Sequence, residues 1–159
     1  MEIQIDYFAR INQAKHLFLR SLTPLSIAEL ELIVEEAIVN EAMRGSIEST
    51  SLPVELSFLL NDAAPIESVE GCLSFRLYWK RIAAFLVTEE CVGGCGQYDD
   101  EVYEGKRFRL YSKSHFLEHL ARDTGGHLGE LIHYKIVCEH QLIDIVSDAL
   151  PEIEIISRR

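Results

Sequence analysis

Three side chains near residue 117 have types and a spacing that could bind zinc. His115, Glu118 and His119 lie in the stretch SHFLEHLARDT, in the order H-x-x-E-H. On a helix the two imidazoles would share one face, one turn apart, where they could hold a metal ion. The neighbouring carboxylate could then accept or donate a proton. The pattern therefore predicts metal-assisted hydrolysis as one chemistry open to this chain.

The rest of the chain offers no clear third ligand for such a zinc ion. The pattern resembles the signature of the inverted zinc proteases, in which a later helix supplies that ligand, but the residues after 125 have the pattern of strands. A helical wheel places His115 and His119 on the polar arc. The opposite arc is apolar and consists of Phe116, Leu117, Leu120 and Ala121. We therefore expect an amphipathic surface helix with two exposed histidines. A small zinc hydrolase, with His127 or His133 as a further ligand, is the alternative.

Four cysteines are a second set with possible chemistry. Cys91 and Cys95 have the spacing of one half of a zinc knuckle, in a glycine-rich segment, but the second half is missing as a unit. Structural zinc, redox pairing and ordinary loop thiols all remain open for this pair, and loop thiols are favoured. Cys72 and Cys138 lie in predicted strands, where we expect them to serve as small core residues.

No other segment has a pattern typical of catalysis. The sequence lacks the G-x-S-x-G turn of serine hydrolases, and no local context would activate Ser74, Ser112 or Ser147. The GGCG stretch lacks the residues of a phosphate-binding loop, and the carboxylates that follow it would repel an anion. We assign no catalytic residue.

Charge restricts the kind of partner. The 159 residues have a formal net charge of −11, which disfavours binding to the phosphate backbone of nucleic acids. No apolar run approaches the roughly 18 residues of a membrane span, and the first residues do not resemble a secretory signal. We expect a cytoplasmic protein with reduced cysteines, no membrane association and no cofactor.

The first 45 residues have the pattern of two helices. Apolar residues recur at three- and four-residue steps over 6–22, and Thr23-Pro24 ends that segment. Ser26 and Glu29 have the spacing of a capping box, which predicts a second helix that runs to about Arg44 before Gly45. This helical hairpin would carry acidic side chains on one side, among them Glu29, Glu35 and Glu36.

The period changes after the exposed segment 45–53. Partial alternation or short apolar runs predict strands over 54–60, 71–79, 82–88, 106–112, 131–138 and 142–147. Residues 91–106 have the composition of a loop, and a helix capped by Ser112 or Ser114 ends at Gly125-Gly126. The strands 71–79 and 82–88 are joined so tightly that we expect them to pair antiparallel.

These elements predict an α+β fold in a single domain spanning 1–159. An N-terminal helical hairpin (1–45) would pack with a mostly antiparallel sheet of about five strands (54–156) that contains one inserted helix.

The charge and the incomplete catalytic sets favour a small acidic protein that binds another protein. Its most concrete form is a bacterial immunity or antitoxin-type protein whose carboxylates attract and block a basic partner. A zinc hydrolase and a non-catalytic or homodimeric subunit, associated through the N-terminal hairpin, are the alternatives. The expected contact residues are Glu29, Glu35, Glu36, Asp99, Asp100, Glu101, Tyr103, His115 and His119.

Overall fold

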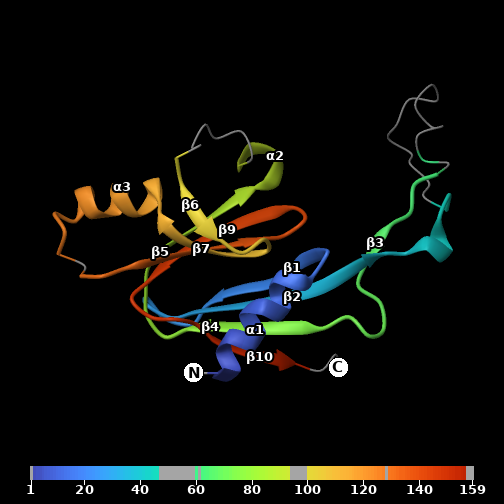
Figure 1. Cartoon of the computed structure of the whole chain (residues 1–159), viewed down its shortest axis with the longest axis horizontal. Coiled ribbons are helices and arrows are strands. Elements are labelled where there is room, and N and C mark those ends of the chain that lie inside the picture. The colour runs from blue at the N-terminus through green and yellow to red at the C-terminus, as the bar shows by residue number, and fades with distance from the viewer. Residues whose placement is uncertain (1, 47–59, 61, 94–99, 128, 157–159) are drawn as a thin grey trace.

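The chain folds into two packed β-sheets with short helices at their margins (Figure 1). The computed structural model describes residues 2–46, 60, 62–93, 100–127 and 129–156. The predicted strand over 54–60 falls almost wholly outside these residues, as do Cys95 and Asp99.

The first sheet contains strands from both ends of the chain. Its order is β1 (His16–Pro24), β2 (Leu30–Val39), β4 (Ser74–Trp79) and β10 (Glu152–Ile156), and β3 (Ile66–Glu67) pairs with the end of β2. All of these neighbours are antiparallel.

The second sheet is also antiparallel. Its order is β5 (Ile82–Glu89), β9 (Gln141–Ser147), β8 (Ile132–Val137), β7 (Phe108–Lys113) and β6 (Val102–Glu104). The short connection at Lys80 and Arg81 leads from β4 in the first sheet to β5 in the second. The expectation that these two strands pair with each other is therefore wrong. The Ile82 N–H donates instead to the Ala28 carbonyl in the β1–β2 turn, where the chain crosses between the sheets.

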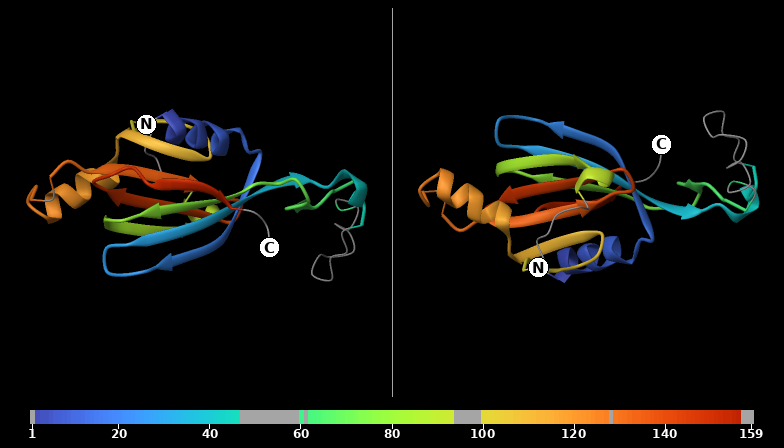
Figure 2. Two further views of the ribbon diagram at one scale, coloured as in Figure 1. Left: turned by 90° about the horizontal axis from the view of Figure 1, so that it is seen from below. Right: turned by 90° about the horizontal axis from the view of Figure 1, so that it is seen from above.

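Short helices lie around the two sheets. They are α1 (Glu2–Gln13), the 3₁₀ turn η1 (Glu41–Met43), α2 (Glu90–Gly93) and α3 (His115–Asp123). Helix α1 lies beside the β6–β7 hairpin (Figure 2) and contacts β7 and β10, which belong to different sheets. Helix α3 follows β7 directly and carries the H-x-x-E-H residues, and its cap is Ser114 rather than Ser112.

The predicted N-terminal helical hairpin is wrong, and with it the α+β arrangement around a single five-stranded sheet. After α1 the chain forms the β1–β2 hairpin. Leu30, Leu32 and Val34 alternate along β2 and are completely buried, which is the period of a strand with one face in the core. The Ser26 hydroxyl does accept hydrogen bonds from the backbone N–H groups of Ala28 and Glu29. These hydrogen bonds lie in the turn between two strands. A capping box and such a turn look alike in sequence, because in both a serine oxygen accepts backbone N–H groups two or three residues further on.

The core lies between the two sheets. On one side Leu30, Leu32 and Val34 are paired with Trp79, Leu77 and Phe75 of β4. On the other side the core residues of β8 and β9 pair with each other, and they are Tyr134, Ile136, Ile143 and Ile145. Burial of each such large side chain contributes about 1.5–3 kcal/mol. The predicted strands 71–79, 82–88, 106–112, 131–138 and 142–147 correspond to β4, β5, β7, β8 and β9. The predicted loop 91–106 contains β6.

Candidate functional site

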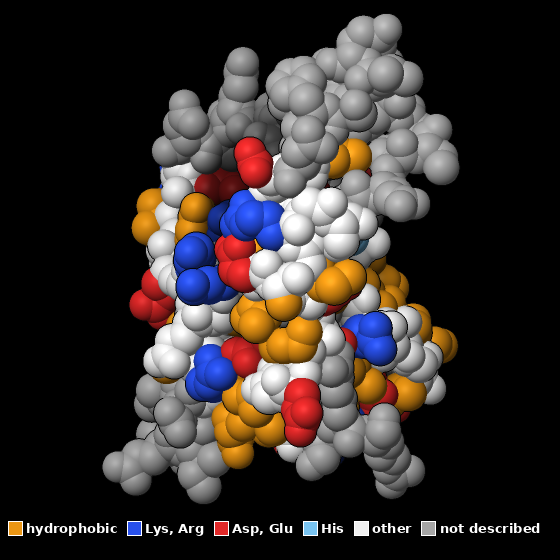
Figure 3. All heavy atoms as spheres, turned by 90° about the vertical axis from the view of Figure 1, so that its right-hand side faces the viewer, with side chains coloured by type: hydrophobic (Ala, Val, Ile, Leu, Met, Phe, Trp, Pro, Cys, Tyr) orange, Lys and Arg blue, Asp and Glu red, His pale blue; other side chains and the backbone are white. Residues whose placement is uncertain are grey.

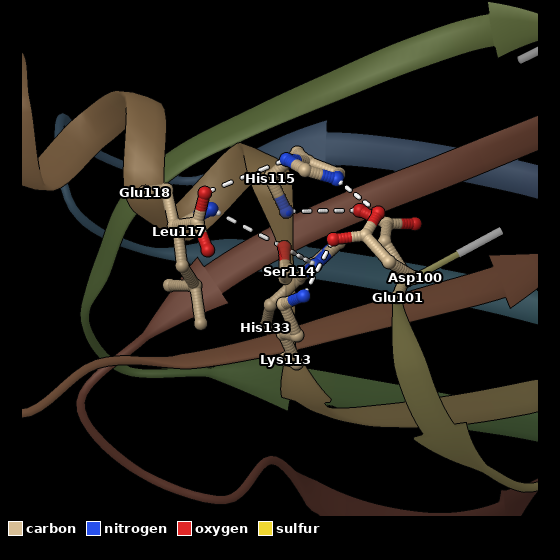
Figure 4. Close-up of polar contacts among 8 residues, drawn as sticks. All are labelled: Asp100, Glu101, Lys113, Ser114, His115, Leu117, Glu118 and His133. Carbon is tan, nitrogen blue, oxygen red and sulfur yellow. Dashed lines mark hydrogen bonds and ion pairs between the residues drawn. The ribbon is translucent and has the colours of Figure 1, made fainter. Parts of the chain in front are cut away.

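A serine at the junction of β7 and α3 organises the end of the second sheet (Figure 4). Ser114 has an extended backbone, and its hydroxyl oxygen accepts a hydrogen bond from the Leu117 N–H at 3.2 Å. It therefore caps α3 and satisfies one of the backbone donors that a helix leaves unpaired at its start. Ser114 is only 2% exposed, so this cap faces the protein interior.

The same serine begins a buried chain of polar contacts. Its Oγ lies 2.6 Å from Nδ1 of His133 on β8, and Nε2 of that histidine lies 2.8 Å from Oδ1 of Asp144 on β9. Lys135 Nζ lies 3.1 Å from the same carboxylate oxygen. The His133 ring stacks on Tyr111, with 4.2 Å between ring centroids. Ser114 Oγ and both ring nitrogens of His133 therefore have partners, as buried polar groups require.

These residue types are those of a serine hydrolase, but their arrangement differs. In a catalytic triad the serine faces substrate, its histidine partner uses Nε2, and the aspartate holds Nδ1. Here the two ring nitrogens have exchanged roles, and Ser114 Oγ is already the acceptor for Leu117. His133 is 1% exposed. The Ser114–His133–Asp144 chain therefore fixes α3 to the sheet and does not present a nucleophile.

A second, exposed cluster surrounds the start of α3 (Figure 4). Asp100 places one carboxylate oxygen 2.7 Å from His115 Nε2 and the other 2.5 Å from Lys113 Nζ. The Glu101 carboxylate accepts the His115 N–H at 3.0 Å. Hydrogen bonds from Lys113 and His115 lower the pKa of Asp100 to about 2, and the hydrogen bond to Asp100 raises the pKa of His115.

The predicted zinc ligands do not converge. Glu118 Oε2 lies 3.4 Å from His115 Nδ1, while the other nitrogen of that ring faces Asp100. His119 instead lies 3.4 Å from Asp123, one turn further along α3. Within residues 2–46, 60, 62–93, 100–127 and 129–156, no three His, Cys, Asp or Glu side chains are placed to hold a metal ion. The H-x-x-E-H residues lie along the outward side of α3, as the wheel predicts.

Two of the predicted contact residues, Glu35 and Glu36, are internal. The expectation that they line an acidic outer surface is wrong, because residues 30–39 form a central strand of the first sheet. Glu35 accepts a hydrogen bond from Ser74 and lies 3.2 Å from Arg20 Nε. Glu36 pairs with Arg10 of α1 at 2.8 Å and accepts the Leu73 N–H. These carboxylates connect elements of the fold.

The remaining predicted contact residues lie in two separate places. Glu29 follows the β1–β2 turn and accepts the Tyr78 hydroxyl at 2.6 Å, and this hydrogen bond lowers the pKa of the carboxyl. Asp100, Glu101, Tyr103, His115 and His119 lie together around β6 and α3, and Asp99 falls outside the described residues. The exposed Tyr103 ring packs on Tyr111 and carries the Arg109 guanidinium 4.5 Å above it.

An apolar hollow lies next to this cluster. Val102 and Tyr103 of β6, Ile132 of β8 and the exposed Leu150 are among the side chains that line its volume of about 590 Å³. Tyr103 and Tyr111 both line the hollow, and their rings contact each other with 5.0 Å between centroids. Apolar and charged side chains are thus adjacent at this end of the second sheet.

Elsewhere, much of the surface charge is paired. Arg76 bridges Glu31 and Glu154, and Arg44 pairs with Glu41. Figure 3 shows a face on which basic and acidic side chains lie side by side among hydrophobic ones. The net charge of −11 therefore does not translate into a uniformly acidic surface.

The contact between His133 and Asp144 is not evident from the sequence alone. There His133 is a possible further zinc ligand, and Asp144 is a carboxylate outside any convincing helix that could supply such a ligand. The sequence does contain a signal for it. His133 and Asp144 are polar residues within the otherwise apolar strands IHYKIV and QLIDIV, and a buried polar group needs a partner. Pairing them requires the β8–β9 register, in which Lys135 lies opposite Asp144.

Among the helices of the described residues, none is both long and apolar enough to cross a membrane. No protein-family model, curated protein or solved structure matches this chain.

Proposed function

We propose that this chain is a non-enzymatic protein that binds a basic protein partner through the surface around α3. This α3 surface is defined by Asp100, Tyr103, His115, Glu118, His119 and Asp123. The observation that carries the proposal is that these side chains gather around the start of α3, which the buried Ser114–His133 contact holds to β8. An immunity or antitoxin-type protein that covers a basic site on its target is the most concrete form.

The chemistry of the α3 surface supports a basic partner. The Asp100, Glu118 and Asp123 carboxylates are exposed there beside the cations Lys113 and Arg122, and exposed carboxylates attract a basic protein toward them. Tyr103 adds a large, partly exposed aromatic ring beside the apolar hollow, and aromatic anchors next to charged groups are typical of binding hot spots. Pre-organised elements reduce the entropy cost of binding.

We further place the protein in the cytoplasm as part of this proposal. Cys72 and Cys138 are free thiols, and Cys138 is completely buried. Burial raises the pKa of the Cys138 thiol to about 12, which keeps it protonated and unreactive. Free thiols in a chain of this size support a reducing compartment.

The test compares two sets of charge removals on the tagged full-length chain. The first variant is Asp100→Asn, Glu118→Gln and Asp123→Asn, which removes three charges from the α3 surface. The matched control is Glu67→Gln, Glu70→Gln and Glu152→Gln, which removes three exposed charges elsewhere. Each bait is incubated with an extract of the source cells, and the retained proteins are eluted with increasing salt.

We expect the wild-type chain and the control to retain the same basic protein and the α3 variant to lose it. Elution should need little salt, because attraction between exposed charges is screened. Equal retention by the α3 variant and the control would contradict the assigned surface. A retained protein that is acidic, or binding that is indifferent to salt, would contradict the proposed partner chemistry.

A further inference from the structure

Strand β5 is an open edge of the second sheet with apolar side chains on it. It pairs with β9 on one side, and no strand of the described residues pairs with it on the other. Phe85, Leu86 and Val87 are 39%, 49% and 42% exposed, and no residue from Ile82 to Thr88 is charged. An edge strand of this kind presents unpaired backbone N–H and C=O groups together with apolar side chains, which suits it for pairing with another strand.

The other sheet edges have features that oppose such pairing. Strand β1 has a register shift between Leu19 and Ser21, where the exposed Arg20 interrupts the ladder. Strand β10 carries exposed Glu152 and Glu154, and β6 is three residues long. Bulges, edge charges and short length are the usual means of protecting a sheet edge. Strand β5 also has a register shift, between Ile82 and Ala84, but this lies near its start, and the strand combines eight residues with an uncharged centre.

We propose that β5 pairs antiparallel with β5 of a second copy of this chain, forming one continuous sheet across a two-fold axis. The charges at the two ends of the strand indicate this occupant. Lys80 and Arg81 precede the uncharged run, and Glu89 and Glu90 follow it. Antiparallel pairing of two copies places the basic end of each strand beside the acidic end of the other, whereas parallel pairing would oppose like charges.

The side chains fit the same register. When Phe85 lies opposite its own copy, Leu86 faces Ala84 and Val87 faces Ala83, so that these two large side chains each meet a small one. Arg81, the residue before β5, then faces Glu89 at its end, and Lys80 and Glu90 extend the same opposite charges beyond the strand. A two-fold contact is self-complementary, so every favourable pair occurs twice. Arg81 is bonded to Asp148 at 2.5 Å, but its side chain is 69% exposed and has room to exchange partners.

The pairing would also cover apolar surface that the single chain leaves open. Phe85 and Val87 pair with Ile145 and Ile143 of β9 and share their core-facing side of the sheet. A neighbouring strand would extend this layer beyond its present margin. Because β5 and β6 are opposite edges of the second sheet, the α3 surface remains accessible. Dimerisation through β5 and partner binding through the α3 surface therefore use different edges of the sheet and can be tested separately.

The test uses two variants that are complementary to each other. Lys80→Glu with Arg81→Glu makes both ends of β5 acidic, and Glu89→Lys with Glu90→Lys makes both ends basic. Each variant alone should raise the dimer dissociation constant by about tenfold or more, since like charges then oppose each other at both ends. An equimolar mixture should restore a dimer that contains one copy of each, as measured by analytical ultracentrifugation over a wide concentration range.

An apolar substitution provides an independent check. Leu86→Lys places a charge at the centre of β5 and should give a monomer, whereas Leu150→Lys, at a residue that is 55% exposed, should leave the mass unchanged. Far-ultraviolet circular dichroism establishes that each variant is folded. A wild-type chain that sediments as a monomer throughout the range would overturn the proposal. So would a mixture of the two folded charge variants that forms no mixed dimer.

Discussion

The Ser114 hydroxyl lies 2.6 Å from Nδ1 of His133, and both residues are buried although one of them begins a surface helix. None of the residues of α3, all of them described, is itself buried. The helix is therefore held less by an apolar face than by its cap, with Phe116 packing edge-on against the His133 ring. Ser114 Oγ accepts the Leu117 N–H and also forms the hydrogen bond with Nδ1, while the carboxylate of Asp144, which can only accept, takes the hydrogen bond from Nε2. One serine thus links the first turn of α3 to the interior of the second sheet.

Replacing Ser114 should therefore destabilise the protein more than expected for the loss of one small side chain. Ser114→Ala removes the helix cap and leaves His133 Nδ1 without its partner, which should lower the free energy of unfolding by about 2–3 kcal/mol. Urea denaturation followed by circular dichroism measures this change. Ser112→Ala is the control, because its hydroxyl makes one exposed hydrogen bond to the Val102 carbonyl. Equal losses in the two variants would show that the buried contact does not stabilise the fold.

A single asparagine fastens α1 to the turn between β6 and β7. Asn12 Oδ1 accepts the backbone N–H groups of Lys106, Arg107 and Phe108, and its Nδ2 donates to the Phe108 carbonyl. Asn12→Ala should cost about 2–3 kcal/mol of unfolding free energy, because several backbone groups lose their partner together. The control Asn40→Ala removes one hydrogen bond to Glu67. A hydrogen bond contributes about 0.5–1.5 kcal/mol to stability, and because this one is exposed, its loss should cost less than about 1 kcal/mol. Hydrogen exchange at Arg107 and Phe108 should accelerate in the Asn12 variant and stay unchanged in the Asn40 variant.

Gly105 in the same turn allows a close approach that no other residue type could make. Its φ is 91°, and an added Cβ would lie 2.0 Å from the Phe108 carbonyl oxygen. Gly71 has almost the same φ, 92°, with nothing within 4 Å of an added Cβ. Gly71→Ala should therefore cost about 1 kcal/mol from backbone strain alone, and Gly105→Ala should cost clearly more. Thermal or urea unfolding of the two variants separates strain from collision, and equal losses would contradict this account.

The sequence correctly predicts those strands whose apolar pattern fits a strand better than a helix. In β8 and β9 the apolar runs are short and bounded by turn residues, so that a strand is the better fit. The segment Ile27–Ala42 is different, because its apolar residues satisfy both periods. Leu30, Val34 and Ala37 fit a helix, and Leu30, Leu32 and Val34 fit a strand. The choice is made by strand pairing that the segment itself does not encode, above all by β4, which pairs with residues 30–35 and lies far away in the sequence.

In the candidate site, too, features that depend on one helix alone are predicted and features that depend on strand pairing are not. The wheel places His115 and His119 on the outside because that argument uses only neighbours along one helix. The contact between Ser114, His133 and Asp144 depends on the β7–β8–β9 register, which no local pattern encodes. The mistaken exposure of Glu35 and Glu36 follows directly from the helix that was expected there.

Glu36 should behave as a structural carboxylate. It holds Arg10 of α1 through both of its oxygens and also accepts the Leu73 N–H, so it joins α1, β2 and the residue before β4. Glu36→Gln keeps the shape but removes the charge, and should lower the free energy of unfolding by about 1–2 kcal/mol, given that Arg10 is partly exposed. Glu70→Gln, on the exposed surface, should change it by less than about 0.5 kcal/mol. If Glu36→Gln were as neutral as the control, the connection between α1 and the first sheet would not depend on this ion pair.

The pair formed by His115 and Asp100 should give the α3 surface a defined pH dependence. The hydrogen bond to Asp100 raises the pKa of His115 above its ordinary value of 6.5, so the stabilisation is complete below that value and is lost as the pH rises through the folded pKa. Hydrogen bonds from Lys113 and His115 lower the pKa of Asp100 from 3.8 to about 2, so its contribution is present above 3.8 and is lost as the pH falls toward 2. The cluster should therefore be most stable between those two ordinary values.

Titration of the His115 ring by NMR should give a midpoint above 6.5 in the wild-type chain and a lower one in Asp100→Asn. Asp123→Asn, which removes the partner of His119, is the matched control and should leave the His115 midpoint in place. An Asp100→Asn variant that titrates like the wild type would show that Asp100 does not hold the imidazolium, and the pH dependence of the α3 surface would then have to originate elsewhere.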